Sequence, residues 1–228
     1  MTKSVAVMLA ICAFVVAAKA VGPFVQPDDI DIKSILSPPP AQDSDQTRAE
    51  IERLLQLQAK RTDADVKRIR SEVKFTPFIF SDVLGSWFNP DDLPTTAGFL
   101  KEVMKNAASV EGHAKVIFGR HRPFVVDSRI HPCVEKEKTY SYPSGHATRS
   151  MVLALTLAQM FPDHKDALIA QAKQIGDDRV LAGQHFPSDV EAGRTLAKAI
   201  FQQMTKNPDF QAELQKARDE CLAKDTAK

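Results

Sequence analysis

The chain has 228 residues, of which 43% are hydrophobic, enough for one compact domain. Its 30 lysines and arginines face 29 aspartates and glutamates, so the formal net charge is only +1. This balance gives no general field for a nucleic-acid polymer or an anionic membrane. Tyr and Trp are scarce, which also argues against a surface for stacking bases. Any affinity for anions must come from a local cluster of cations.

The N-terminus has the layout of a secretory signal peptide over residues 1–20. A basic start with Lys3 precedes an apolar run, and Ala18 and Ala20 provide small residues for cleavage after Ala20. The run is shorter than the roughly 20 apolar residues of a membrane-spanning helix. An uncleaved N-terminal anchor is the alternative. We therefore predict a periplasmic or secreted protein with no membrane span after signal cleavage.

The next part of the chain changes from an irregular to a helical pattern. Residues 21–45 are rich in Pro and Asp and predict an extended lead-in over the surface. A helical domain is predicted over residues 46–228, and Thr62 with Asp63 can cap its second, short helix. Residues 75–88 are strongly apolar and are expected to pack into the core.

Further helices follow in the second half of the chain. Pro94 predicts the first turn of a long helix that runs to residue 118, and a loop follows over residues 122–143. The remaining helices are predicted over residues 144–160, 163–181, 188–204 and 207–221. Because convincing strand patterns and glycine-rich hairpin turns are absent from the sequence, the predicted fold class is all-α, a single-domain helical bundle.

Three short stretches carry polar groups from which a site could be built. In the first, Lys115 and Arg122 are separated by six residues, and Pro123 follows directly. A helix end and the loop after it could bring these two cations to one anion. Taken singly, either cation is better explained as part of a solvated helix face.

The second stretch runs from Pro143 through Ser144 and Gly145 to His146, ahead of an apolar helix. The Ser144 hydroxyl can donate a hydrogen bond, and Gly145 lets the backbone approach a ligand closely. Free N–H groups at a helix N-terminus also bind anions. An ordinary serine cap beside a surface histidine is the alternative, but it does not explain why Pro, Gly and His gather there.

The third stretch contains Arg179, His185 and Asp189. The guanidinium can bind two phosphate oxygens. The spacing of four lets the Asp189 carboxylate accept the His185 N–H, which fixes the tautomer and raises the nucleophilicity. Taken alone, a capping Asp near a structural His explains the pair equally well. Together the three stretches supply the cations, neutral donors and two histidines that phosphoryl transfer needs.

In this order the stretches resemble the signature of the type 2 phosphatidic acid phosphatase and vanadium haloperoxidase superfamily. The run over residues 141–146, the exported context and the size resemble the bacterial class A non-specific acid phosphatases. The resemblance implies the helical fold of that superfamily and a phosphohistidine intermediate in the hydrolysis of small phosphomonoesters. It also implies inhibition by vanadate, as a phosphate mimic, and suggests a homodimer.

The resemblance also implies a role for each matching residue. His185 attacks phosphorus, Asp189 orients it, and His146 protonates the leaving alcohol and later helps to activate water. The phosphate-binding roles pass to Lys115, Arg122, Ser144, Gly145 and Arg179.

Other polar residues depart from the family pattern or lie beside it. Asp178 stands where the family usually has Ser, and it adds negative charge to the site unless it faces away or pairs with Arg179. Arg120 and His121 are interpreted as rim or solvated residues. With both site imidazoles near the ordinary pKa of about 6.5, we expect a mildly acidic optimum.

No cofactor or metal is predicted. His113, His131 and His164 lack ligand spacing, and the carboxylates form no recognisable cluster, so we expect activity without a divalent cation. After signal cleavage only Cys133 and Cys221 remain. An even pair in an oxidising compartment predicts a disulfide, with two unrelated thiols as the alternative.

Three other functions remain open at this point. A lipid phosphate phosphatase usually needs membrane spans, and a vanadate-dependent haloperoxidase tends to be larger. A non-catalytic phosphate-binding protein would gain nothing from a His–Asp pair and a second His. We rank all three below an acid phosphatase, and a panel of phosphate substrates would separate them.

Overall fold

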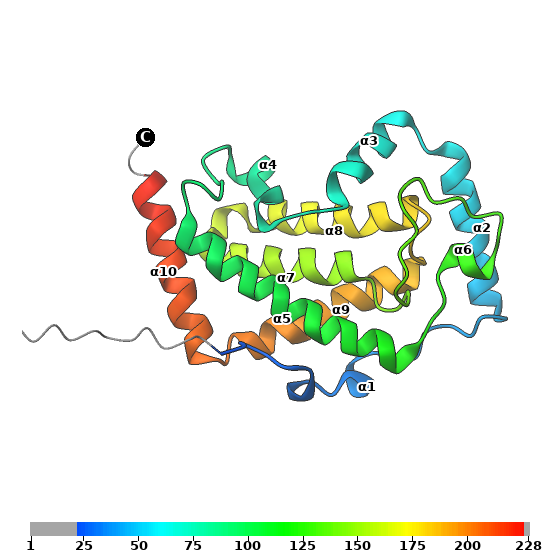
Figure 1. The fold of residues 1–228 in the computed structure, drawn as a ribbon, viewed down its shortest axis with the longest axis horizontal. Coiled ribbons are helices and arrows are strands. Elements are labelled where there is room, and N and C mark those ends of the chain that lie inside the picture. The colour runs from blue at the N-terminus through cyan, green and yellow to red at the C-terminus, as the bar shows by residue number, and fades with distance from the viewer. Residues whose placement is uncertain (1–21, 226–228) are drawn as a thin grey trace, which may run out of the picture.

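The computed structural model describes residues 22–225, which form a bundle of helices without a strand (Figure 1). The predicted signal peptide lies outside the described residues. The long helices in the second half of the chain are α5 (Pro94–Phe118), α7 (Gly145–Met160), α8 (Lys165–Leu181), α9 (Pro187–Met204) and α10 (Pro208–Asp225). The predicted all-α fold class is confirmed. Within the described range no helix combines the length and the apolar character needed to cross a bilayer.

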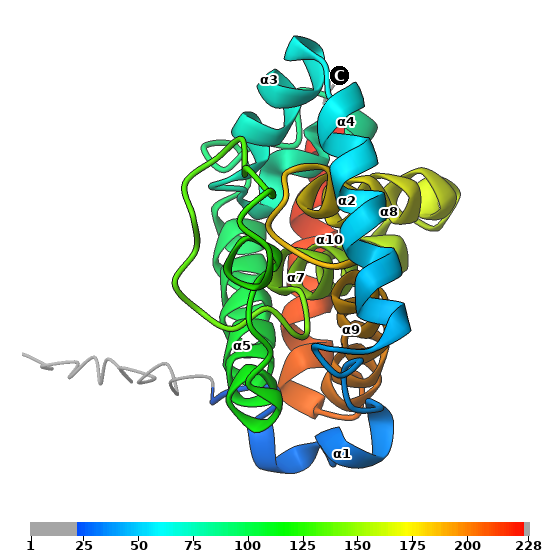
Figure 2. The same cartoon turned by 90° about the vertical axis from the view of Figure 1, so that its right-hand side faces the viewer.

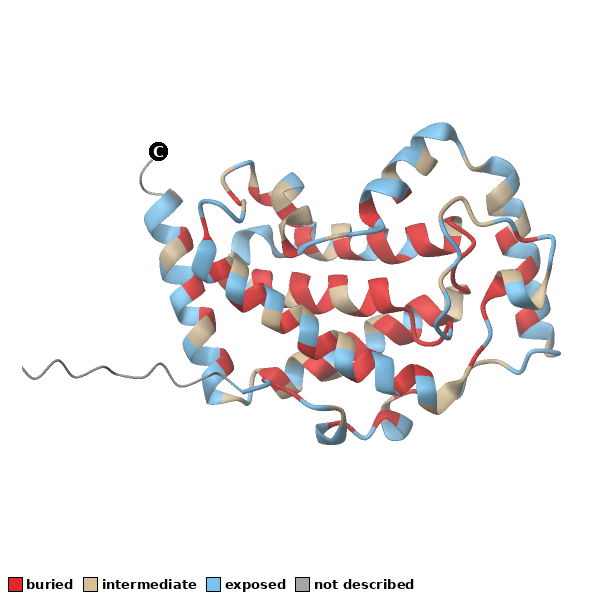
Figure 3. Cartoon of the chain, viewed as in Figure 1, coloured by how far each residue is buried: buried red, intermediate tan, exposed pale blue. Residues whose placement is uncertain are grey.

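Helix α7 lies at the centre of the bundle, packed against α5, α8 and α9 (Figures 1 and 2). Most of its side chains are buried, including the apolar run from Met151 to Ala154 (Figure 3). A helix without a polar face is stable only when other helices cover it. Because α7 starts at Gly145, this central position brings the second sequence motif into the interior.

Helix α5 has the predicted bounds, and its two ends have identifiable causes. Pro94 occupies the first turn, where its missing N–H costs nothing. At the other end Gly119 adopts a left-handed φ of 59°, and its N–H donates to the carbonyl of Lys115. The stop places Lys115 in the last turn of the helix and Arg122 just beyond it.

The helices before α5 follow the capping signals of the sequence. Helix α2 (Asp45–Lys60) begins after Ser44, one residue before the predicted start at residue 46, whereas α3 (Asp63–Glu72) begins after Thr62, as predicted. The apolar segment that follows contains the short helices η2 (Pro77–Phe80) and α4 (Ser81–Leu84) and packs into the core as expected.

Two later helices differ slightly from the predicted bounds. The predicted start at residue 163 falls in the short helix η3 (Pro162–His164), so α8 itself begins at Lys165. Helix α10 continues to Asp225, four residues beyond the predicted end.

The lead-in differs from the extended surface segment that its composition predicts. Residues 27–35 contain two short helices, η1 (Pro27–Asp29) and α1 (Ile32–Ile35). Phe24 and Val25 are buried in the main core, and their N–H groups donate to Oδ1 of Asn106 at 2.5 and 3.2 Å. This segment therefore forms part of the bundle and lies beneath α5 and α9 (Figure 1).

The predicted disulfide between Cys133 and Cys221 is wrong, because both cysteines are free. Cys133 lies in the loop after α6 (Pro123–Val126), where its N–H donates to the carbonyl of Ala182. Cys221 is buried in α10 with its Sγ 3.5 Å from Oγ1 of Thr96. Helices α6 and α10 lie at opposite ends of the bundle, so the thiols cannot meet (Figure 1).

Candidate active site

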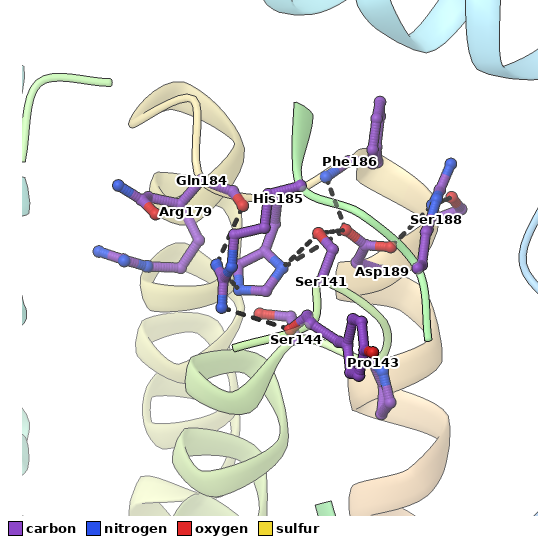
Figure 4. A network of polar contacts seen from close by, with 12 residues as sticks. Ser141, Pro143, Ser144, Arg179, Gln184, His185, Phe186, Ser188 and Asp189 are labelled. Carbon is purple, nitrogen blue, oxygen red and sulfur yellow. Dashed lines mark hydrogen bonds and ion pairs between the residues drawn. The ribbon is translucent and has the colours of Figure 1, made fainter. Parts of the chain in front are cut away.

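The second and third sequence motifs meet at the N-terminal ends of α7 and α9 (Figure 4). The first motif joins them there, because Lys115 contacts Pro143 and Arg122 contacts His185. Lys115 comes from the last turn of α5, and Arg122 immediately precedes α6. Arg179 lies in the last turn of α8. The remaining predicted residues belong to the starts of the two helices: Ser144, Gly145 and His146 at α7, and His185 and Asp189 at α9.

The His185 ring is fully buried and faces Asp189, as the sequence spacing predicts. Its Nδ1 lies 3.4 Å from Asp189 Oδ2 and 3.4 Å from the Ser141 hydroxyl. The same carboxylate oxygen accepts hydrogen bonds from Ser141 Oγ at 2.5 Å and from the Phe186 N–H at 2.9 Å (Figure 4). The Nδ1–H of a neutral imidazole can therefore point to Asp189, which leaves Nε2 without a proton.

The Nε2 side of the His185 ring faces cations. Arg122 Nη1 lies 3.2 Å from this nitrogen, and since a guanidinium only donates, the contact matches an unprotonated Nε2. Burial, together with the charges of Arg122 and Lys115, holds the pKa of His185 well below its usual range. The ring is consequently neutral, as a nucleophile must be.

Lys115 is buried and anchors the segment that leads into α7. Its Nζ donates to the carbonyls of Tyr140 at 2.9 Å and Pro143 at 2.6 Å, and it lies 3.5 Å from Glu111 Oε1. Burial lowers the pKa of Lys115, and the carboxylate of Glu111 acts in the opposite direction. In this structure the ammonium therefore fixes the loop before the second motif and adds its charge to the site.

Glu137, on the loop between α6 and α7, joins the two motif arginines. Its Oε2 accepts from Arg122 Nη2 at 2.5 Å, and its Oε1 accepts from Arg179 Nη2 at 2.6 Å. Burial raises the pKa of Glu137, but the charges of Arg122 and Arg179 lower it to about 2. The carboxylate thus stands where two oxygens of a phosphate could bind. Nothing in the sequence pattern marked this residue.

Two of the buried motif residues have unused hydrogen-bonding atoms. Within residues 22–225, Nε and Nη1 of Arg179 and Nε2 of His146 have no hydrogen-bond partner. Both residues line a pocket of about 540 Å³, together with Lys115 and Glu137. Buried polar atoms are nearly always paired in proteins, so the two unpaired guanidinium donors of Arg179 indicate a site for an anionic ligand.

His146, the second residue of α7, packs its ring against Phe75 with the ring centroids 5.3 Å apart. Burial, followed by the charges of Arg179 and Arg149, lowers the pKa of His146 to about 3. The expectation of two imidazoles with ordinary pKa values is therefore wrong. At neutral and mildly acidic pH the His146 imidazole is therefore mostly neutral in this structure.

Ser144 and Gly145 contribute mainly to the helix end. The Ser144 hydroxyl caps α7 by accepting from the Ala147 N–H, so the ordinary capping alternative describes it as it stands. A Cβ on Gly145 would lie 2.5 Å from Glu111 Oε1. The group that comes close to the Gly145 backbone is therefore the Glu111 carboxylate, which would have to move to make room for a larger residue.

Arg120 is buried, and its interpretation as a rim or solvated residue is wrong. Its Nη1 donates to Asp189 Oδ1 at 2.7 Å, and its Nη2 donates to Glu50 Oε2 at 2.9 Å. Neighbouring His121 is exposed and solvated as expected. Arg120 and Ser141 are thus two residues of the site that sequence reasoning missed; only their position inside the motif stretches could have indicated them.

Asp178 faces away from the motif residues. Arg68 on α3 binds its carboxylate with two hydrogen bonds, from Nε at 2.6 Å and from Nη2 at 2.8 Å. The first of the two predicted possibilities is therefore correct, and the acid does not pair with Arg179. The described residues also contain no group of three or more His, Cys, Asp or Glu side chains arranged to hold a metal ion.

Comparisons with known proteins agree with this geometry. The sequence profile of the PAP2 superfamily matches residues 96–209. The chain is 32% identical over 214 residues to a non-specific acid phosphatase of Salmonella typhi, covering 90% of this chain and 86% of the relative. It is 31% identical over 202 residues to a non-specific acid phosphatase of Providencia stuartii, covering 84% and 81%. The crystal structure of a bacterial vanadium-dependent iodoperoxidase shares the fold, with a TM-score of 0.63 and 16% identity over 78% of this chain and 54% of that chain.

Proposed function

The chain belongs to the PAP2 superfamily and is an acid phosphatase, and we propose that it hydrolyses small phosphomonoesters through a phosphohistidine formed on His185. The observation that carries the proposal is the placement of a buried, neutral His185 against Asp189 on one side and cations on the other. The unpaired donors of Arg179 add a place for phosphate oxygens.

The proposed first step is an in-line attack by Nε2 of His185. The P–Nε2 bond forms while the P–O bond to the alcohol breaks, and Nε2–H of protonated His146 gives its proton to the leaving oxygen. Asp189 accepts the Nδ1–H bond and stabilises the positive charge that the phosphorylated ring acquires. Lys115, Arg122 and Arg179 offset the charge on the phosphoryl oxygens.

The second step returns the enzyme to its starting state. Water attacks phosphorus as the P–Nε2 bond breaks, and neutral His146 accepts the proton of that water. His185 leaves with its lone pair on Nε2, and phosphate is released. Atoms and protons therefore balance over the cycle without a cofactor, and we expect turnover to survive treatment with a chelator.

The acidic activity follows from the charge that the substrate brings. Without such charge the pKa of His146 is about 3. A bound phosphate adds one or two negative charges beside the ring, which raises the pKa of its imidazole toward its usual range. Proton uptake should therefore accompany binding of phosphate or vanadate at pH 5, as measured by calorimetry in buffers of different ionisation enthalpy.

Other parts of the proposal rest on the sequence. Export to the periplasm or medium is proposed from the layout of residues 1–20, and a homodimer is proposed from the class A resemblance alone. N-terminal sequencing of the exported protein and its mass in solution test these two points.

The central experiment compares wild type with His185→Ala. The chelator-treated proteins are given p-nitrophenyl, nucleotide, sugar and lipid phosphates, and the phosphoenzyme is trapped and located by mass spectrometry. We expect the variant to lose all labelling and about 10⁶-fold in kcat, the scale seen when the nucleophile of a catalytic triad is removed. Exposed His164 supplies the control, since His164→Ala should retain full activity. Labelling at a different residue would refute the proposal.

A further inference from the structure

The carboxylate of Asp189 divides its two oxygens between different partners. Oδ2 accepts from Ser141 Oγ and the Phe186 N–H and faces His185. Oδ1 accepts from Arg120 Nη1 at 2.7 Å. Hydrogen bonds to both oxygens fix the plane of the carboxylate, and with it the direction in which Oδ2 meets the imidazole.

Arg120 is itself held from several sides. Its Nη2 binds Glu50 on α2, its Nη1 also binds Ser188 Oγ at 2.7 Å, and its guanidinium lies 3.9 Å from the centre of the Phe186 ring. Glu50 in turn accepts the Ser188 N–H at 2.7 Å. The guanidinium therefore links the first motif to α2 and to the first turn of α9, and its position is set by the contacts of both Nη atoms and by the Phe186 ring.

We propose that Arg120 is a positioning residue for the phosphatase reaction, which orients Asp189 and balances its charge so that His185 remains a neutral, correctly aligned nucleophile. This inference rests on the proposed function and deepens it. The side-chain contacts of Arg120 are with Asp189, Glu50, Ser188 and Phe186 and not with the His185 ring, so we infer that it acts through Asp189.

The proposal predicts in which direction the pKa of His185 changes when the charge of Arg120 is removed. The groups whose charge acts on the His185 ring are Lys115, Arg122, Glu137, Arg179 and Asp189. With Arg120 present, the positive charge of its guanidinium partly offsets the negative charge of the Asp189 carboxylate. Without it the full negative charge acts on the imidazole and raises its pKa. A larger fraction of the nucleophile is then protonated and inactive at acidic pH.

The experiment uses two substitutions of Arg120 in the full chain. Arg120→Met removes both the charge and the fork, and we expect kcat/KM to fall about 100-fold, the cost of misplacing a catalytic group by about 1 Å. The acid limb of its pH profile should move to higher pH. Arg120→Lys keeps the charge, so its acid limb should stay in place, but one ammonium cannot replace the fork and kcat should fall about tenfold.

The matched control is Arg194→Met. Arg194 is also a largely buried arginine with carboxylate partners, Asp177 and Glu191, and it lies on the same helix as Asp189. Its loss should lower the stability without moving the acid limb or kcat. Should Arg120→Met fail to fold, Glu50→Gln replaces it, because it removes the outer support of Arg120 while leaving the charge on Asp189; its kcat should fall several-fold at unchanged KM.

A second readout separates this inference from the proposed function. Nitrogen-15 NMR of the histidine side chains reports the tautomer and pKa of His185 without substrate. We expect Arg120→Met to raise that pKa and to reduce the preference for the Nδ1–H form. If wild type forms no phosphoenzyme, the proposed function fails. An active wild type, with kcat, acid limb and His185 tautomer unchanged in the Arg120 and Glu50 variants, would refute the role of Arg120 alone.

Discussion

Glu137 shows how one side chain can compete with a substrate for the same cations. Its two carboxylate oxygens bind Arg122 and Arg179 with the separation and charge that a phosphate would offer. About a third of the side chain is exposed, and it lies on the loop after α6 rather than on a helix. A substrate that uses both arginines must therefore displace this carboxylate.

Replacing Glu137 with Gln should strengthen the binding of phosphate and of substrate. An amide keeps one acceptor but removes the charge, so the two guanidiniums are released at lower cost. We expect about tenfold lower KM and lower inhibition constants for phosphate and vanadate, which corresponds to about 1.4 kcal/mol. Glu135→Gln, an exposed change in the same loop, should leave both constants unaltered. Equal constants in all three proteins would contradict competition by Glu137.

The residues that sequence could predict differ from the others in a physical way. His185 and Asp189 lie four residues apart on one turn, so their contact is a local property of the chain. Arg120 meets its partners Glu50 and Asp189 across 70 and 69 residues. Such contacts exist only after the helices have packed, and no spacing in the sequence reports them.

At the scale of helices, the contact between α7 and α9 sets the geometry of the site. The Ser144 N–H donates to the carbonyl of Asp189 at 2.9 Å, which joins the two helix starts. Gly193 on α9 makes this approach possible, because a Cβ there would lie 2.7 Å from the carbonyl oxygen of Ser144 and 3.1 Å from Thr148 Oγ1. The obstacle is backbone, which cannot rotate away.

Gly193→Ala should push the two helices apart. We expect a loss of about 1 to 3 kcal/mol, as for other overpacked interiors, and a fall in kcat/KM because Ser144 and Asp189 separate. Gly98→Ala on α5 is the matched control, since nothing lies within 4 Å of its Cβ and alanine favours a helix by about 0.5 to 1 kcal/mol. Thermal melts and kinetics of both variants test this. A melting temperature for Gly193→Ala at or above wild type would refute the steric argument.

The helix bounds could be predicted because residues within one turn of each end determine where the helix begins or stops. Pro94, Thr62 and Ser144 act within one turn of their own position. The expectation of an extended surface segment before α2 is wrong because that segment makes distant contacts. The N–H groups of Phe24 and Val25 donate to Asn106, which is more than 80 residues away. Composition is a local property of a segment, whereas its burial depends on contacts with residues that are distant in the sequence.

For the molecule as a whole, Glu72 couples stability to pH. It is buried at the end of α3, and burial together with the charge of Asp178 raises its pKa to about 8. Between about pH 4.5, its usual value, and pH 8, the folded chain keeps a proton that the unfolded chain releases. Stability from this group is therefore full below pH 4.5 and is lost as the pH rises through 8, at no more than about 1.4 kcal/mol per pH unit.

Glu72→Gln should remove this part of the pH dependence, because the amide resembles the protonated acid. In urea unfolding the variant should match wild type near pH 4.5 and be more stable than wild type at pH 8. Glu52→Gln, an exposed change on α2, should follow wild type at both values. A stability difference between Glu72→Gln and wild type that does not grow with pH would contradict the assignment.

The buried contact of Glu50 with Arg120 has a consequence for where the working unit begins. A chain trimmed to residues 96–209 would keep every motif of the signature, yet it would lack α2 and the outer half of this ion pair. It would also lose the packing of Phe24 and Cys221. The segment that carries the motifs is thus shorter than the segment whose packing and ion pairs support the site.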